Sequence, residues 1–257
     1  MRILFLGDVV GRPGRRAVQQ CLPSLIESHS PDFTVVNGEN SAAGFGITAD
    51  CAKEIFNAGA DAITLGNHAY HHRDAAECLK AEPRIARPAN MPPGAPGAEI
   101  VRITKNEHTL AVINLCGRVF MADYDDPFRA SDRLIGEAGT ENILIDFHAE
   151  ATSEKVAFSH YVDGKVSAVV GTHTHVQTAD ERILPGGTAA ITDVGMCGPE
   201  DSVIGMDKQI ILRKFLTQLP ERFLVAEGPS MVCGVIIDVG EAGRALAIER
   251  FRWTGIH

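Results

Sequence analysis

Short apolar runs that end abruptly in polar residues recur along the chain. Within each run the apolar positions are mostly consecutive rather than alternating, which is typical of strands buried on both faces of a parallel sheet. The run at residues 61–65 shows the pattern most clearly, because Gly66, Asn67 and His68 follow it at once. The pattern predicts five such strands, at residues 2–7, 33–36, 61–65, 143–147 and 166–170.

Apolar residues at helical spacing lie between these predicted strands. After Pro13, apolar positions recur three and four residues apart, which predicts a helix that begins near this proline. Thr48 is a residue type typical of a helix N-cap and predicts the start of a second helix. Further helices are predicted at residues 73–80 and 150–159. Strands that alternate with helices indicate an α/β fold whose parallel strands are joined by right-handed crossovers.

The second half of the chain adds antiparallel pairs to this pattern. Residues 99–104 and 108–115 are rich in β-formers and flank a short polar turn, which predicts a hairpin. Residues 231–239 and 244–253 predict a longer antiparallel pair near the C-terminus. So much β-structure late in the chain predicts a second layer of sheet. Because no linker or repeat interrupts the pattern, we expect a single domain over residues 1–257.

Composition narrows the class of protein. With 257 residues and 45% hydrophobic content, the chain can bury one sizeable core. Its net charge of -9, without a run of Lys or Arg, disfavours a broad nucleic-acid-binding face. The six cysteines are scattered, which predicts reduced and mostly buried thiols. No signal-peptide pattern or run of roughly 20 apolar residues is present, so we expect a soluble cytoplasmic protein that does not enter a membrane.

The polar residues after the apolar runs are the candidate functional residues. All can donate nitrogen or oxygen to a metal or move a proton, and they are Asp8, Asn37, Glu39, Asn40, Asn67, His68, His148, His173 and His175. Sites in open α/β sheets lie at the carboxyl ends of the strands. If these runs are strands of one sheet, their ends bring these side chains to one place, which predicts a two-metal hydrolytic site.

The donor types indicate which chemistry such a site performs. No cysteine takes part, and an all-nitrogen and oxygen ligand set suits Mn, Fe or Zn. Two metal ions roughly 3.5 Å apart need a bridging ligand, and Glu39 or Asp8 can provide it. Asp146 lies inside an apolar run, so we expect it behind the ligands. A metal-bridging hydroxide would be the nucleophile. His68, one residue out of phase with Asn67, is free to protonate the leaving alcohol.

The pair of histidines late in the chain supports the same site. His173 and His175 follow a predicted strand, separated by Thr174. In an extended segment, residues two apart point to the same side. We therefore expect the two imidazoles to bind one metal ion or two adjacent ones.

These motifs resemble the calcineurin-like metallophosphoesterases, in the same order and at similar spacing. Two positions depart from that family's usual pattern: Val10 stands where a histidine is usual, and Glu39 replaces the usual bridging aspartate. Both departures match the YmdB-type phosphodiesterases of bacteria. The segments that carry this closer resemblance cover the chain at residues 7–15, 37–42, 65–68, 146–155, 171–178 and 193–199.

The resemblance implies a four-layer αββα sandwich of two mixed sheets flanked by helices. It implies hydrolysis of small cyclic nucleotides, with 2′,3′-cyclic and 3′,5′-cyclic monophosphates as candidate substrates. It also implies two metal ions, usually iron or manganese, and a homo-oligomer. One metal position matches Asp8, Glu39, Asn40 and His175; the other matches Glu39, Asn67, His148 and His173, with Glu39 bridging. His68 matches the general acid.

Two other functions compete with this interpretation. A His-x-His pair also marks amidohydrolases, but there it belongs to the first strand of a (β/α)₈ barrel, whereas His173 and His175 come late in this chain. A non-catalytic regulator that binds nucleotide or RNA could retain a metal site for folding. The intact His68 argues against that regulator, because a structural metal needs no proton donor.

Overall fold

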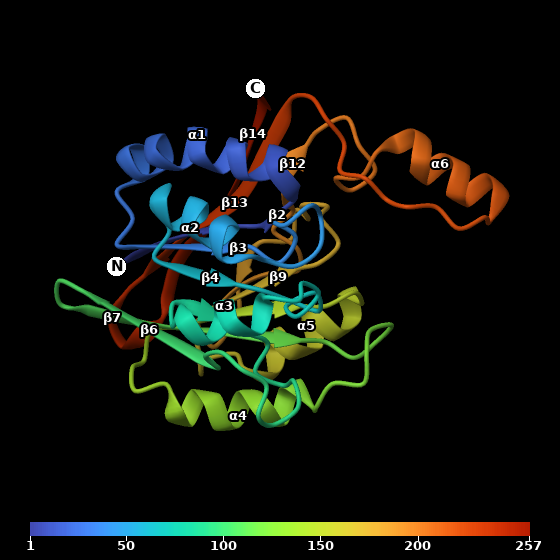
Figure 1. Cartoon of the computed structure of the whole chain (residues 1–257). Helices are drawn as coiled ribbons and strands as arrows, with labels where there is room; N and C mark the ends of the chain where they lie inside the picture. The colour runs from blue at the N-terminus through green and yellow to red at the C-terminus, as the bar shows by residue number, and fades with distance from the viewer.

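Two β-sheets pack face to face in the computed structural model, which describes all 257 residues, and helices cover the outer faces of both sheets (Figure 1). The first sheet has eight strands in the order β2-β12-β13-β1-β3-β4-β5, with β14 paired to β13. Its strands are β1 (Arg2–Leu6), β2 (Asp8–Val9), β3 (Phe33–Asn37), β4 (Ala62–Thr64), β5 (Ile85–Ala86), β12 (Met196–Pro199), β13 (Ser230–Val239) and β14 (Ala245–Ile256).

The second sheet has six strands in the order β10-β11-β9-β8-β7-β6. Its strands are β6 (Ile100–Lys105), β7 (His108–Cys116), β8 (Ile143–His148), β9 (Ala168–Thr172), β10 (Arg182–Ile183) and β11 (Ala189–Ile191). The helices are α1 (Gly11–His29), α2 (Ala49–Asn57), α3 (Ala75–Ala81), α4 (Pro127–Glu137), α5 (Thr152–Tyr161) and α6 (Lys208–Thr217), with a short 3₁₀ turn η1 (Glu241–Gly243). None of these helices combines the length and apolar character that a bilayer crossing requires.

Consecutive apolar residues of β1 serve both faces of the first sheet. Ile3 and Phe5 belong to the core between the two sheets, whereas Leu4 and Leu6 belong to the core beneath α1, α2 and α3. On the other side of the molecule, α4 and α5 cover the second sheet, and the ring of Phe158 stacks on Phe147 with centroids 4.1 Å apart. These four layers confirm the expected α/β sandwich of two mixed sheets.

The strand predictions are largely confirmed. The predicted hairpin is β6 and β7, the late antiparallel pair is β13 and β14, and the five apolar runs overlap β1, β3, β4, β8 and β9. Thr48 caps α2 as predicted, because its side chain accepts a hydrogen bond from the backbone N–H of Cys51. All six cysteines are buried and unpaired. Two helices were not predicted: α4, and α6 on a projecting segment.

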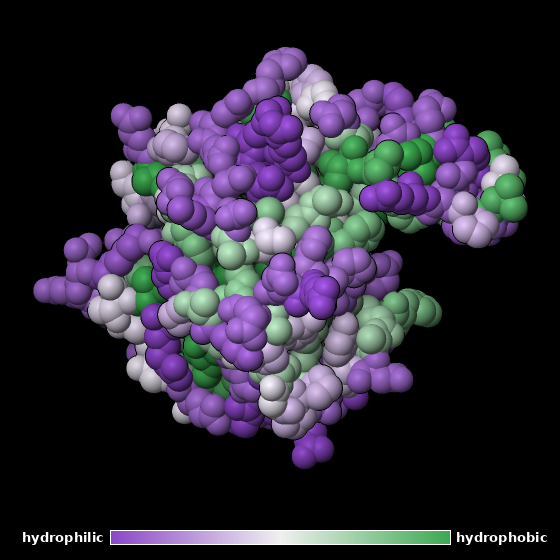
Figure 2. Space-filling model, viewed as in Figure 1, coloured by the Kyte–Doolittle hydropathy of each residue, from purple (hydrophilic) through white to green (hydrophobic).

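That projecting segment, residues 200–228, is called the α6 arm below. Two short paired stretches close its base, where Asp207 N–H donates to Leu224 C=O and Ala226 N–H donates to Gly205 C=O. From this base α6 extends away from the sandwich (Figure 1). Large apolar side chains are exposed along it, and Figure 2 shows them as green patches on the arm. They include Leu212, Phe215, Leu216 and Leu219.

The five strand ends meet across the sandwich and not along one sheet. The strands β1, β3 and β4 run parallel in the first sheet, and β8 and β9 run parallel in the second. The five strands therefore do not belong to one sheet, which was the condition for bringing their ends together in the sequence argument. The carboxyl ends still converge, because the two sheets are stacked so that these ends lie on the same side of the molecule.

In the second sheet, the backbone of β9 lies very close to the residue that follows β11, on the side of the molecule where the strand ends converge. A methyl group on Gly171 in β9 would lie 1.8 Å from the carbonyl oxygen of Thr192. We expect Gly171→Ala to lower the free energy of unfolding by about 1–3 kcal/mol, because a backbone must move to admit the methyl group. Gly136→Ala in α4 is the matched control, since its methyl group would meet nothing within 4 Å. Removing a glycine from a helix interior should stabilise the protein by about 0.5–1 kcal/mol. Urea unfolding measures both, and equal effects would contradict the steric explanation.

Candidate metal centre

Asp8 is a buried carboxylate without a full set of partners. It lies just past β1 and has no exposed surface. Its Oδ2 accepts a hydrogen bond from the backbone N–H of His173 at 3.3 Å, whereas Oδ1 has no hydrogen-bond partner. Ring nitrogens of His148 and His175 lie 3.8 Å and 3.9 Å from Oδ1, which is beyond hydrogen-bond distance. Burial raises the pKa of Asp8, so its charged form needs a nearby cation.

Three polar atoms crowd around one nitrogen of His148. Its Nε2 lies 2.9 Å from Asn67 Oδ1, 2.9 Å from His173 Nδ1 and 3.1 Å from Glu39 Oε1. One ring nitrogen carries at most one proton, so it cannot satisfy three neighbours by hydrogen bonds. Ligand atoms of Glu39, His148 and His173 all lie within 4.8 Å of one another, which is the geometry of a group that can hold a metal ion.

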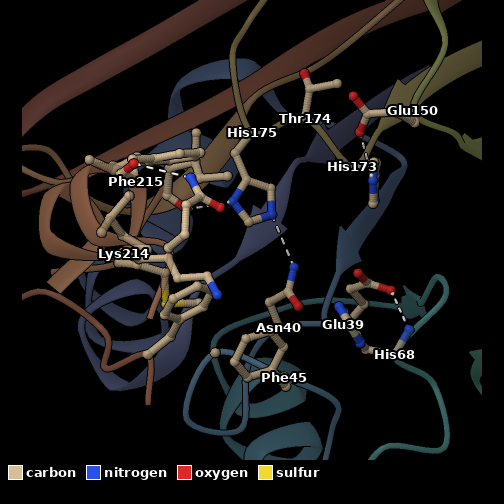
Figure 3. Close-up of a pocket in the computed structure, with 17 residues that line it drawn as sticks. Glu39, Asn40, Phe45, His68, Glu150, His173, Thr174, His175, Lys214 and Phe215 are labelled. Carbon is tan, nitrogen blue, oxygen red and sulfur yellow. Dashed lines mark hydrogen bonds and ion pairs between the residues drawn. The ribbon is translucent and has the colours of Figure 1, made fainter. Parts of the chain in front are cut away.

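A second group of donors lies beside the first. The Nδ2 of Asn40 lies 3.0 Å from Nε2 of His175, and the buried Oδ1 of Asn40 has no hydrogen-bond partner. Nδ1 of His175 lies 2.8 Å from the carbonyl oxygen of Ile204, which can only accept, so Nδ1 carries the proton. That tautomer leaves Nε2 of His175 with a lone pair, which faces Nδ2 of Asn40 (Figure 3). The same nitrogen lies 3.9 Å from Asp8 Oδ1.

A chain of buried polar groups orients His148 from behind. Its Nδ1 lies 2.9 Å from Oγ1 of Thr172, which donates in turn to Asp146 Oδ1 at 2.7 Å. The other oxygen of Asp146 accepts from the Thr64 hydroxyl and from Asn37 Nδ2. Because the Thr172 hydroxyl gives its proton to Asp146, it accepts from His148 Nδ1–H, which leaves Nε2 free to bind a metal. Asp146 thus lies behind the ligands, as expected from the sequence.

The two late histidines face the site for a different reason from the one expected. Their backbone is not extended: φ is 104° at His173 and 66° at His175. The extended-strand argument is therefore wrong, although both rings reach the site. Asp193 holds the loop, because its Oδ2 accepts from the backbone N–H of Thr174 at 3.0 Å and from the buried Lys155 at 2.8 Å.

The sequence did not identify several supporting residues. Glu150 is one of them, and its Oε2 lies 3.0 Å from Nε2 of His173, so this carboxylate can orient the ring. Thr172, Asp193 and Lys155 are others. One signal was available: Lys155 falls on the same face of α5 as the buried Phe158, a position where a charged side chain needs a buried partner.

His68 lies at the edge of the donor groups. Its backbone N–H donates to Glu39 Oε2 at 3.1 Å. Its ring makes edge contacts with Phe45, at a centroid distance of 5.1 Å, and with His71, at 5.5 Å. Burial lowers the pKa of His68, and the Glu39 carboxylate opposes this shift. The ring thus lies beside the donors and is not one of them.

A cavity of about 500 Å³ opens over these groups. On one side of it lie Glu150 and His173, on the other Lys214 and Phe215 of α6, and Glu39, Asn40 and His68 line the floor between them (Figure 3). Asp8, Asn67 and His148 lie behind this lining. A ligand in the cavity would therefore meet Glu39, His68, His173 and His175 directly.

The donors fit a metal centre. Buried oxygens of Asp8 and Asn40 lack partners, and no lysine or arginine forms an ion pair with Asp8 or Glu39. Burial, followed by the nearby His148, lowers the pKa of His173 to about 3, so the ring is neutral and one of its two nitrogens has a lone pair available for ligation. Nitrogen and oxygen donors of this kind suit Mn, Fe or Zn.

Two stacked mixed sheets, with metal-binding side chains at the strand ends that face one another, define the metallophosphoesterase fold. Within this class, the family model described as YmdB-like protein matches residues 4–251. The chain belongs to the YmdB-like family, which confirms the resemblance seen in the sequence.

Relatives cover nearly the whole chain. The 2′,3′-cyclic-nucleotide 2′-phosphodiesterase of Bacillus subtilis strain 168 is 53% identical over 253 residues, which are 97% of this chain and 96% of that protein. A hypothetical protein from Thermus thermophilus has a crystal structure with a TM-score of 0.95 and 43% identity, covering 99% of this chain and 100% of the other. A novel phosphatase from Mycoplasma pneumoniae has a TM-score of 0.94 and 33% identity, covering 99% and 93%.

The chain of groups behind His148 generates a prediction. In Asp146→Asn, one oxygen becomes an NH₂ group that faces donors of Thr64, Thr172 or Asn37. We expect metal affinity to fall about 10- to 100-fold, because the tautomer of His148 is no longer fixed. Competition titration against a chelator measures this affinity. Asp132→Asn, at a surface carboxylate paired with Lys165, is the control. Equal affinity in wild type and Asp146→Asn would contradict the orienting role.

Proposed function

We propose that this protein is a dinuclear-metal phosphodiesterase that hydrolyses cyclic nucleotides, with 2′,3′-cyclic monophosphates as the first substrate class and 3′,5′-cyclic monophosphates as the second. The supporting observation is the convergence of unpartnered buried oxygens of Asp8 and Asn40 with the group of Glu39, His148 and His173, under an open cavity. The name of the Bacillus subtilis relative supports the substrate class.

The two groups of donors would hold two metal ions. Asp8, Asn40 and His175 would hold one and Asn67, His148 and His173 the other, with Glu39 as the bridging ligand. When bound, the ions would supply positive charge to a phosphate and acidify a water molecule. Iron or manganese is our proposed metal. Val10, where related enzymes carry a histidine, is apolar and fully buried, and Asn40 would replace that ligand.

Side chains of the protein would position the substrate and protonate its leaving oxygen. A phosphodiester anion would lie in the cavity over Glu39 and His173, with the ribose toward His68. Attack by water forms a new phosphorus–oxygen bond and breaks the bond to one ribose oxygen, which leaves as an alkoxide unless it is protonated. The His68 ring, held beside the donors by Phe45 and by the Glu39 contact to its backbone, would donate that proton. The product would be a nucleoside monophosphate.

The proposal is tested by metal content and turnover of the purified protein. We expect about two metal ions per chain, and hydrolysis of bis-p-nitrophenyl phosphate and of 2′,3′-cyclic nucleotides that depends on added manganese. Glu39→Gln should lose bound metal and activity together, since an amide is a poor bridging ligand. Glu77→Gln, an exposed carboxylate on α3, is the control. A fully metallated and active Glu39→Gln protein would exclude the bridging role.

The proton donor is tested separately. His68→Ala should retain metal and fold, but its kcat on cyclic nucleotides should fall by about 10²- to 10⁴-fold, because the leaving oxygen is no longer protonated. His71→Ala is the matched control, since His71 packs in the same aromatic group without lining the cavity. Unchanged kcat in His68→Ala would remove this residue from catalysis. Wild type that binds metal and nucleotide without hydrolysing any phosphodiester would indicate a binding regulator instead.

A further inference from the structure

The cavity has a polar half and an apolar half, and the proposed metal centre accounts only for the polar residues. Its polar half carries Glu39, Asn40, His68, His173 and His175. Its other half is mostly apolar and comes from one loop beside His68 and from the α6 arm. The apolar lining residues are Phe45, Val203, Ile204, Met206, Ile211, Phe215 and Phe223. A bare phosphodiester would contact the polar half and leave this wall unused.

Phe45 lies on the side of the cavity where the leaving group must lie. Its ring is 5.1 Å from the His68 ring and 5.4 Å from that of His71. In a 2′,3′-cyclic phosphate both ester oxygens belong to one ribose, so whichever bond breaks, the ribose lies beside the proton donor. The base projects from C1′, away from the phosphate. A ribose beside His68 therefore directs its base past Phe45, toward the arm.

The α6 arm presents an apolar surface on the other side of the cavity from Phe45. Ile211 and Phe215 are four residues apart, so they lie on the same face of α6. Both line the cavity, as does Lys214. Figure 3 shows Lys214 and Phe215 on the same side of it. Ile211 is buried, whereas Phe215 is 70% exposed. An aromatic ring with so little packing of its own has a face free to stack on a ligand.

We propose that Phe45 together with Ile211, Lys214 and Phe215 of the α6 arm forms a subsite for the nucleobase of the substrate. The proposal rests on the proposed phosphodiesterase function and adds the part of the substrate that the polar half does not contact. Stacking and apolar contact accept any base, because every base has a π-face. The subsite therefore takes all four nucleosides, and binds the larger purines more tightly than the pyrimidines.

The test compares a nucleotide with the same reacting ring lacking a base. Steady-state kinetics of the metal-loaded full chain are measured on 2′,3′-cyclic AMP and on ribose 2′,3′-cyclic phosphate. For wild type we expect a lower KM on the nucleotide. Phe215→Ala should raise the KM for 2′,3′-cyclic AMP about 10-fold and leave kcat unchanged, because stacking stabilises the bound substrate and the transition state equally. Its KM for the base-free substrate should not change.

A neighbouring residue supplies the control. Leu216→Ala removes an 82% exposed side chain from the same helix, outside the cavity lining, and should alter neither KM. Phe45→Leu is the second variant, at the opposite wall, and should raise the KM for the nucleotide relative to that for the base-free substrate, as Phe215→Ala does. Because Phe45 also packs against the His68 ring, the kcat of this variant is not compared. Since Phe215 is largely exposed, its removal leaves the fold intact.

Three results would overturn the subsite. Equal KM values of wild type for the nucleotide and the base-free substrate would show that the base is not recognised, while the phosphodiesterase function would stand. A KM increase in Phe215→Ala that is the same for both substrates would assign the ring to the structure of the arm. Hydrolysis of neither substrate by wild type would overturn the proposed function, and the subsite with it.

Discussion

Negative charge enclosed between the two sheets is the constraint on which the rest of the structure depends. Asp8, Glu39 and Asp146 are all buried, and none forms an ion pair with lysine or arginine. A buried carboxylate without a partner costs several kcal/mol of folding free energy. Hydroxyl and amide donors satisfy Asp146, but Asp8 keeps an unpartnered oxygen. Positive charge supplied from outside the chain would relieve this cost.

The site is assembled from parts of the chain that are far apart in sequence. In the first sheet Asp8 begins β2 and Glu39 follows β3, whereas in the second sheet His148 ends β8 and His173 follows β9. Neither sheet carries a complete set of ligands, so the geometry exists only when the sheets are stacked. Metal bound between them would stabilise the native state against unfolding and tie the two sheets together, because the unfolded chain has no preformed site.

The local sequence predicted strands and candidate site residues where polar residues directly follow an apolar run. An apolar run followed by Asp8, Glu39 or His148 shows both a buried strand and the polar residues at its end, so the convergence of these residues could be predicted. The partition of strands between two sheets could not, because either arrangement buries the same apolar residues. The positive φ of His173 and His175 has no signature in residue type. Signals for α4 were present, since Asp126 caps it and Pro127 begins it. In α6 most large side chains, including Leu212, Phe215 and Leu216, are exposed, so the apolar pattern does not mark a single face that packs on the core.

One hydrogen bond connects the α6 arm to a histidine of the candidate metal centre. Nδ1 of His175 donates to the carbonyl oxygen of Ile204, and Ile204 belongs to the arm. Displacing the arm would therefore remove the acceptor that fixes the tautomer of His175. A ligand that displaced the arm would therefore alter the free energy of metal binding at His175 in the proposed site, and thermodynamic linkage would require the reverse effect to be equal. Metal binding at the proposed site and displacement of the arm would then be coupled to one another.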